Sequence, residues 1–184
     1  MANYGSIIEW VLRLEDRTLA GKTEDLGDGA GLTRLGLTTR DEGGVLPKYY
    51  WVDDLPQYRM SNLAALEVAK QVYYDRYWTP LRGTQLLNDE VAATLMSFAV
   101  NDGVGTAVKL IQRVLGVAVD GVLGPNTLAE INYRDSLGGS EALAEALRDA
   151  QEARYLEIEA RKPEDAKFDA GWRKRAYVRY PDLP

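Results

Sequence analysis

The chain has 184 residues, of which 22 are basic and 28 acidic, so its formal net charge is −6. Hydrophobic residues make up 46% and charged residues 27%, an ordinary globular balance that excludes fibrous repeats and wholesale disorder. Because cysteine and histidine are both absent, disulfides, thiolate nucleophiles, His-based triads and His or Cys zinc sites are excluded. Acid–base chemistry near neutral pH must therefore use carboxylates, lysine or tyrosine.

Charge and hydropathy also limit the expected partners. Net acidity argues against nucleic-acid binding as the main role. Residues 1–17 show no basic segment followed by a long apolar core, so we expect no secretory signal peptide. Apolar runs are far shorter than the roughly 20 residues that span a bilayer, so we expect no stable membrane insertion. We further expect a monomer without a cofactor or a metal site.

The first predicted element is a helix that ends near Glu15. Ser6 followed by Glu9 fits a capping box at its start. One apolar stripe at i, i+3 and i+4 is formed by Ile8, Val11 and Leu12. Glu15 is the i+7 position of that stripe, which points it toward the core or the floor of a cleft. An apolar setting there would favour the protonated carboxylic acid.

The next segment, 20–44, is rich in glycine, threonine and acid, which favours a small β-hairpin or an irregular loop. Residues 47–58 predict an ordered loop with a short helical turn. Helical spacing and helix-terminal signals then predict helices at 61–78, 88–101, 106–115, 125–131 and 140–161. The fold class is therefore mainly α, with a small N-terminal β or loop lobe and a soft boundary around 82–87.

Three residues make up a candidate catalytic set. Glu15 ends the first helix, and Asp28 and Thr33 follow in a glycine-rich frame. This order suits glycoside hydrolysis, in which a protonated carboxylic acid donates to the leaving oxygen and a second carboxylate positions water or stabilises positive charge. The pattern alone leaves an alternative open: Glu15 pairs with Arg13 or Arg17, and the other two side chains cap turns.

These residues resemble the glycoside hydrolase family 108 N-acetylmuramidases, which are phage and bacterial lysozymes. After Glu15 the chain matches the pattern D-x-(G/A)-G-x-T-x-x-G-(L/I)-T, beginning at Asp28. Further matching blocks follow in the same order: YYDRYWTPL at 73–81, FAVNDGVG at 98–105, AVKLIQRVL at 107–115, VDGVLGPNTL at 119–128, and the closing G-W-x-x-R at 171–175. The resemblance therefore covers most of the chain.

The resemblance implies a lysozyme-like fold (a helical lobe, a small β lobe and a cleft between them). It implies a catalytic region at 1–82 and a helical peptidoglycan-binding-like region at 83–184, packed as one unit. Glu15 falls on the family's general acid, and Asp28 and Thr33 on its Asp and Thr positions. The implied reaction is hydrolysis of the β-1,4 bond between N-acetylmuramic acid and N-acetylglucosamine in bacterial peptidoglycan.

The chain departs from the family at one place. Members have E-G-G-Y after the first helix, whereas this chain has Glu15-Asp16-Arg17-Thr18. The departure leaves an alternative, a catalytically weakened peptidoglycan-binding or phage structural module on the same fold. The main hypothesis is a phage-type endolysin that waits in the host cytoplasm before lysis and then acts on periplasmic peptidoglycan.

Aromatic and polar side chains are candidates for sugar binding, since polysaccharide clefts use ring faces against sugar rings. The candidates are Tyr50, Trp51, Tyr77, Trp78 and Asn101. Aromatic residues at helical spacing are also typical of a hydrophobic core. The loop 120–127 has either a structural role or a role in peptidoglycan binding. The basic stretch 172–180 either touches the anionic wall or balances nearby acids.

Overall fold

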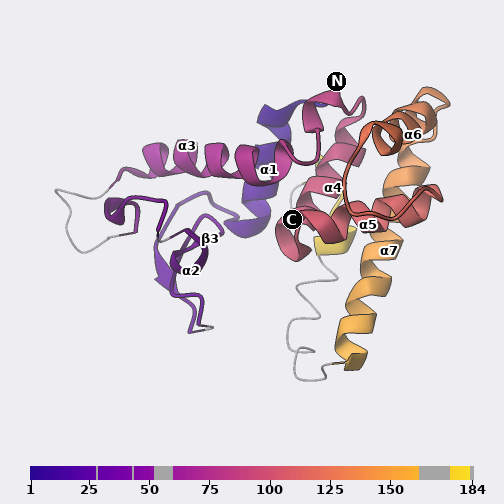
Figure 1. Cartoon of the computed structure of the whole chain (residues 1–184). Coiled ribbons are helices and arrows are strands. Elements are labelled where there is room, and N and C mark those ends of the chain that lie inside the picture. Colours follow the sequence, from indigo (N-terminus) through magenta and orange to yellow (C-terminus); the bar gives the residue numbers. More distant parts are fainter. Residues whose placement is uncertain (28, 43, 52–59, 162–174, 183–184) are drawn as a thin grey trace. The chain divides into compact units, whose positions relative to one another are not determined.

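The computed structural model describes residues 1–27, 29–42, 44–51, 60–161 and 175–182 (Figure 1). Asp28 and the expected G-W pair at 171–172 lie outside the described residues. The elements are, in chain order, α1 Tyr4–Glu15, β1 Glu24–Asp25, β2 Leu32–Arg34, β3 Leu37–Thr38, α2 Thr39–Glu42, the 3₁₀ turn η1 Lys48–Tyr50, α3 Asn62–Tyr73, the π-helical segment η2 Tyr74–Trp78, the 3₁₀ turn η3 Gly83–Gln85, α4 Asp89–Asp102, α5 Val104–Leu115, α6 Pro125–Ser136 and α7 Ser140–Arg161. The predicted mainly α fold class with a small β region is confirmed. Within the described ranges, no helix is long and apolar enough to cross a membrane.

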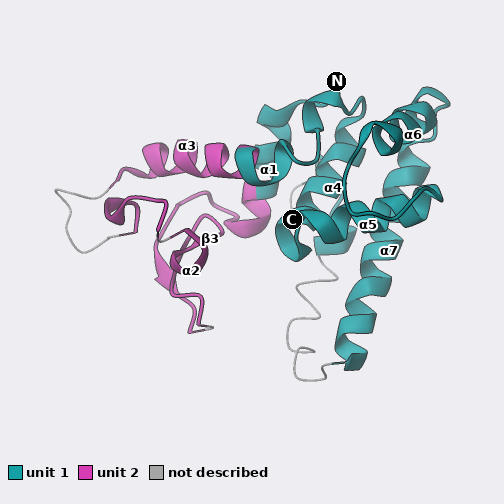
Figure 2. Cartoon of the chain, viewed as in Figure 1, with its two compact units in different colours: residues 1–11, 75–184 teal, residues 12–74 magenta. Residues whose placement is uncertain are grey.

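The chain divides into two compact units (Figure 2). Unit 1 comprises residues 1–11 and 75–184, and unit 2 comprises residues 12–74. This division differs from the expected functional boundary between 82 and 83. That boundary, which concerns catalytic and wall-binding regions, stays a prediction.

Helix α4 forms the core of unit 1. Asn88 caps its start, with Oδ1 accepting a hydrogen bond from the amide of Val91 at 3.0 Å. Nine consecutive residues, Val91–Ala99, are buried, because α4 packs against both α5 and α7. Figure 1 shows these three helices side by side. A helix that is buried on all sides is expected at the centre of a helical core.

A buried arginine ties α7 to α4. Arg148 is 1% exposed and donates to Oε1 of Glu90 at 3.1 Å and to Oε2 of Glu145 at 2.7 Å. Arg179 donates to the same Oε2 of Glu145 at 2.7 Å. For the described part of the basic stretch 172–180, this contact favours the interpretation in which its arginines balance nearby acidic residues.

The start of α1 corrects one prediction. The capping box expected at Ser6 and Glu9 is wrong, because α1 begins at Tyr4, before Ser6. Asn3 lies before the helix, and its Oδ1 accepts from the Ser6 amide at 3.4 Å. Asn3 is also anchored from outside the helix, because its amide donates to Oδ1 of Asp89 at 2.8 Å. The start of α1 is thus fixed by a tertiary contact that the local sequence pattern does not reveal.

Helix α6 is longer than predicted, since it continues from 131 to Ser136. Arg134 explains the extension. It pairs with Glu130 one turn earlier, Nε to Oε1 at 2.9 Å, and donates to the Leu115 carbonyl at the end of α5 at 2.9 Å. The other predicted helices are confirmed to within about two residues, with 74–78 continuing α3 as η2.

Unit 2 contains a three-stranded antiparallel sheet in the order β1-β2-β3. Thr33 pairs with Thr38 and Arg34 with Leu37, which leaves Leu35 and Gly36 as a two-residue hairpin loop. Both loop residues have positive φ, +52° and +75°, the pattern of a type I′ turn that matches the twist of the flanking strands. Burial of the Leu35 side chain, which is 3% exposed, offsets the cost of a left-handed leucine.

Candidate active site

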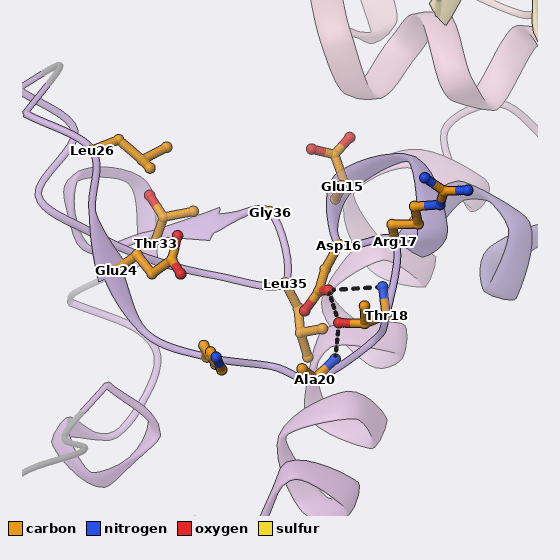
Figure 3. Close-up of a pocket in the computed structure, with 11 residues that line it drawn as sticks. Glu15, Asp16, Arg17, Thr18, Ala20, Glu24, Leu26, Thr33, Leu35 and Gly36 are labelled. Atoms are coloured by element: carbon orange, nitrogen blue, oxygen red, sulfur yellow. Dashed lines mark hydrogen bonds between the residues drawn. The ribbon is translucent and has the colours of Figure 1, made fainter. Parts of the chain in front are cut away.

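An open pocket with a volume of about 700 Å³ lies entirely within unit 2 (Figure 3). It is bounded by the end of α1, the loop that follows, strands β1 and β2, and the hairpin turn. The lining residues are Glu15, Asp16, Arg17, Thr18, Ala20, Lys22, Glu24, Leu26, Thr33, Leu35 and Gly36. Its acidic, basic and hydroxyl groups lie beside a larger share of apolar surface, and this mixed lining suits an amphipathic ligand such as a sugar chain.

Glu15 is the last residue of α1, and the predicted apolar stripe holds this helix in place. Ile8 is 1% exposed, and Val11 and Leu12 are fully buried. Glu15 continues that face, as the spacing predicted: its side chain is partly exposed in the pocket, while its Oε1 atom is buried. A carboxyl group in this position is both shielded and reachable by a ligand.

The hairpin turn packs directly against the stem of Glu15. A methyl group added at Gly36 would lie 2.8 Å from Cγ of Glu15 and 2.3 Å from the hydroxyl oxygen of Tyr73, closer than real contacts allow. The Tyr73 hydroxyl in turn donates to the carbonyl of Leu35 at 3.2 Å, and Tyr73 is 1% exposed. Thus Gly36 is needed both for its positive φ and for its lack of a side chain. Helix α3 holds the turn, and the turn limits where Glu15 lies.

Asp16 organises the loop after α1. Its Oδ1 accepts from the amide and hydroxyl of Thr18 at 3.1 and 3.0 Å, and its Oδ2 accepts from the amide of Gly21 at 2.8 Å. Partial burial raises the pKa of Asp16, but these hydrogen bonds outweigh burial and lower its pKa below the ordinary value. Leu19 within this loop has a φ of +52°. The Asp16-Arg17-Thr18 sequence therefore forms a closed turn that does not need the family's two glycines.

A buried arginine supports the sheet beneath the pocket. Arg34 is fully buried and donates to the carbonyls of Gly21 at 2.7 Å, Tyr50 at 2.6 Å and Met60 at 3.1 Å, and to Oδ1 of Asn62 at 3.0 Å. Its guanidinium carbon lies 5.3 Å from the centre of the Tyr50 ring. One side chain thus ties the loop behind the pocket to the segments before α3.

Two of the three predicted catalytic residues lie in this pocket. Glu15 and Thr33 both line the pocket, and their catalytic roles stay predictions. Asp28 lies outside the described residues, so its place in the site stays a prediction. The structure adds Glu24, which sequence reasoning missed because it stands among several acids. The signal that identifies it is its pairing with Thr33 across β1 and β2.

Three of the predicted sugar-binding aromatics lie in hydrophobic cores. Tyr50 is fully buried in unit 2 and Trp51 is 5% exposed, while Trp78 in unit 1 is 1% exposed and packs on the ring of Tyr4 at 5.2 Å. Burial raises the pKa of Tyr50 to about 12, with the Arg34 charge acting against it. Their burial fits the alternative that these aromatic residues pack in the hydrophobic core. Contacts between these rings and sugars stay a prediction.

The other two candidates belong to unit 1. Tyr77 is half-buried, and Asn101 is exposed. The Nδ2 of Asn101 donates to the hydroxyl of Tyr155 at 2.6 Å, and Nε2 of Gln151 donates to that same buried hydroxyl at 2.6 Å. The Asn101 amide therefore has a structural contact on α7, and its contact with substrate also stays a prediction.

The loop 120–127 has a clear structural function. Nε2 of Gln112, a residue 1% exposed on α5, donates to Oδ1 of Asp120 at 2.7 Å, the carbonyl of Val122 at 3.0 Å and the hydroxyl of Thr127 at 3.2 Å. Its Oε1 accepts from the amide of Gly121 at 2.9 Å. This network supports the structural role for the loop 120–127. Among the residues that the structure describes, no group of three His, Cys, Asp or Glu side chains is placed to hold a metal ion.

Comparisons with known proteins identify related families and a similar structure. Residues 8–103 match the family model described as glycosyl hydrolase 108, and residues 106–177 match one described as a predicted peptidoglycan domain. The solved structure of Brucella abortus SagA is similar, with a TM-score of 0.67 and 25% sequence identity, over 94% of this chain and 88% of that one. No curated protein matches the sequence.

The family match begins within α1 and includes every residue that lines the pocket. It also spans more than half of the chain, and a domain described by peptidoglycan follows it. The chain belongs to the glycosyl hydrolase 108 family and is a glycoside hydrolase that acts on peptidoglycan.

Proposed function

We propose that the pocket of unit 2 is the catalytic site of an N-acetylmuramidase, with Glu15 as the general acid. The bond cut is the β-1,4 link from N-acetylmuramic acid to N-acetylglucosamine. The observation that carries this proposal is the position of Glu15, which is partly shielded at the end of a buried helix, lines the pocket and has its stem against Gly36. Proton donation requires a carboxyl group held within reach of the leaving oxygen.

In this mechanism the glycan lies in the pocket with the scissile oxygen next to Glu15. The carboxylic acid transfers its proton to that oxygen as the bond from the muramic acid C1 breaks, and water adds at C1. Thr33 on β2 lies in the same pocket and offers a hydroxyl for orienting water or substrate. Asp28, which follows the family pattern, is a further candidate for the second carboxylate.

A phage-type endolysin role follows from the motif resemblance and is part of the proposal. The protein is made in the host cytoplasm and meets its substrate in the periplasm when lysis begins. The eleven described residues that line the pocket all come from one unit of one chain, which favours action as a monomer.

The test is mass analysis of the products released from purified peptidoglycan, reduced with borohydride to label new reducing ends. The proposal predicts N-acetylmuramitol at the new ends. Products that end in N-acetylglucosaminitol would overturn the assigned bond. If the wild-type protein binds peptidoglycan and releases nothing, the catalytically weakened binding module is the correct function.

A further inference from the structure

We propose that Glu24 is the second carboxylate of this site and activates the attacking water, an inference that rests on the proposed muramidase function. Nothing in the motif resemblance assigns Glu24 a role, because the family pattern places its carboxylate at Asp28. The inference begins from position: Glu24 lines the pocket together with Glu15 and Thr33.

The sheet register places Glu24 beside Thr33. These two residues are directly opposite each other in the antiparallel pair of β1 and β2. Opposed residues in such a pair point to the same face of the sheet, with Cβ atoms about 4.5–5.5 Å apart. Figure 3 shows the two side chains next to each other on the strand side of the pocket, with Glu15 on the helical side.

Comparison of the carboxylates around the pocket singles out Glu24. Among the residues that the structure describes, three acidic ones line the pocket: Glu15, Asp16 and Glu24. Both oxygens of Asp16 accept hydrogen bonds from its own loop, so Asp16 serves the turn. Glu24 is exposed, and within the described part of the chain no hydrogen bond or ion pair engages its carboxylate. It is therefore available to a water molecule in the pocket.

The chemistry requires two groups on opposite sides of the anomeric carbon. Glu24 takes a proton from water while the water oxygen bonds to C1 of the muramic acid. The bond from C1 to the glycosidic oxygen breaks, and that oxygen receives the proton of Glu15. One water is consumed, and one proton is gained by Glu24 and one lost by Glu15. The hydroxyl of Thr33 gives the water a second hydrogen-bonding partner beside Glu24. Attack by water gives inversion at C1, so the first product is the α-anomer.

The experiment compares Glu24→Gln with Asp25→Asn, a neighbouring strand residue whose Oδ1 caps a local turn by accepting from the amide of Gly27 at 2.9 Å. Turnover of a soluble glycan fragment gives kcat and KM, and circular dichroism verifies folding. We expect kcat to fall by about 10²-fold or more in Glu24→Gln, with KM changed less than about twofold. Asp25→Asn should keep wild-type kcat.

A second variant identifies the role of the carboxylate. In Glu24→Ala, sodium azide should restore turnover and give a glycosyl azide, because azide attacks C1 without losing a proton. Azide should not rescue Glu15→Ala, whose leaving oxygen still lacks a proton donor. NMR of the wild-type reaction should show the α-anomer of the new reducing end first.

Several results would overturn the inference. These are wild-type kcat in Glu24→Gln, a defect confined to KM, a first product in the β configuration, or loss of kcat in Asp28→Asn while Glu24→Gln stays active. The proposed function fails separately, when the wild-type protein releases no products that end in muramic acid.

Discussion

Unit 1 surrounds helix α4, in which residues Val91–Ala99 are all buried, whereas unit 2 is organised around the single side chain of Arg34. Strands of two or three residues cannot bury enough apolar surface to fix a loop-rich unit. The guanidinium of Arg34 supplies fixed hydrogen bonds in place of that surface. Unit 1 thus depends on distributed packing, and unit 2, which holds the pocket, depends on a few exact contacts.

The largest predicted effect is on Arg34. Arg34→Met retains much of the side-chain volume but leaves the carbonyls of Gly21, Tyr50 and Met60 without this donor. Each buried group that loses its partner costs about 1–3 kcal/mol, so we expect unit 2 to lose about 3–5 kcal/mol of unfolding free energy. Urea unfolding followed by circular dichroism and by peptidoglycan cleavage measures the loss.

The matched control is Arg40→Met, because Arg40 is an exposed arginine of the same unit that pairs with Asp41 at 3.2 Å. We expect a change below about 1 kcal/mol there. If Arg34→Met were as stable as Arg40→Met, the central role of Arg34 in unit 2 would be wrong.

Gln112 is the corresponding polar centre of unit 1. Gln112→Ala removes the hydrogen bonds to Asp120, Val122 and Thr127, and we expect a loss of about 2 kcal/mol. The loss should be smaller than that of Arg34→Met, because the helices of unit 1 keep their apolar core. Gln85→Ala, at an exposed position, is the control for thermal unfolding. A loss larger than that of Arg34→Met would reverse the comparison between the units.

Gly36 tests how closely the hairpin positions Glu15. In Gly36→Ala the new methyl group would collide with Glu15 Cγ and the Tyr73 hydroxyl, and we expect kcat to fall about tenfold or more because the acid is displaced. Steady-state turnover measures this fall.

Gly27 and Gly116 separate crowding from backbone strain. Both have positive φ, at +67° and +72°, and among the described residues no atom outside their chain neighbours lies within 4 Å of an added methyl group. Their alanine variants should lose some stability and keep kcat. If Gly27→Ala lowered kcat as much as Gly36→Ala, contact with Glu15 would not be the cause.

The smallest predicted effect concerns protein stability at acidic pH. In each unit, hydrogen bonds lower the pKa of one aspartate. Hydrogen bonds lower the pKa of Asp16 in unit 2, where they outweigh partial burial, and of Asp120 in unit 1, where the Val122 amide and Gln112 contribute most. A lowered folded-state pKa means that the stabilisation is present above the unfolded value of about 3.9 and is lost as pH falls through the folded value.

We therefore expect Asp16→Asn and Asp120→Asn to unfold with a weaker dependence on pH below about pH 4 than the wild type. Solvent screening keeps the Asp16 contribution under about 1 kcal/mol. Melting temperatures measured from pH 2.5 to pH 7 give the comparison. A slope identical to that of the wild type in both variants would show that these carboxylates do not contribute.

Sequence patterns predicted unit 1 better than unit 2 for a physical reason. The pattern places a helix at 140–161, which matches α7 to the residue, because Ser140 and Pro163 mark its ends and it contains many strong helix formers. Arg34 gave no such signal, because its four acceptors come from residues 13 to 28 positions away, and an arginine in a strand is usually exposed. Long-range hydrogen bonds are not visible in local periodicity.

The same limit applied to the site. Glu15 was predicted because it continues the stripe of α1, and Thr33 because it lies in a glycine-rich frame. Glu24 depends on strand register, which two-residue strands do not reveal in sequence. The aromatic pattern does not distinguish sugar-binding side chains from core side chains, because burial depends on tertiary contacts. Tyr50, for example, lies beside the buried Arg34.

The most direct test of the account is the turnover of Glu15→Gln on purified peptidoglycan, compared with Glu9→Gln on an exposed position of the same helix. Glutamine retains the shape of the side chain but has no proton to donate to the glycosidic oxygen. We predict that folded Glu15→Gln loses at least about 10²-fold in kcat while Glu9→Gln retains wild-type turnover. Wild-type turnover in a folded Glu15→Gln protein would contradict the assignment of Glu15 as the proton donor.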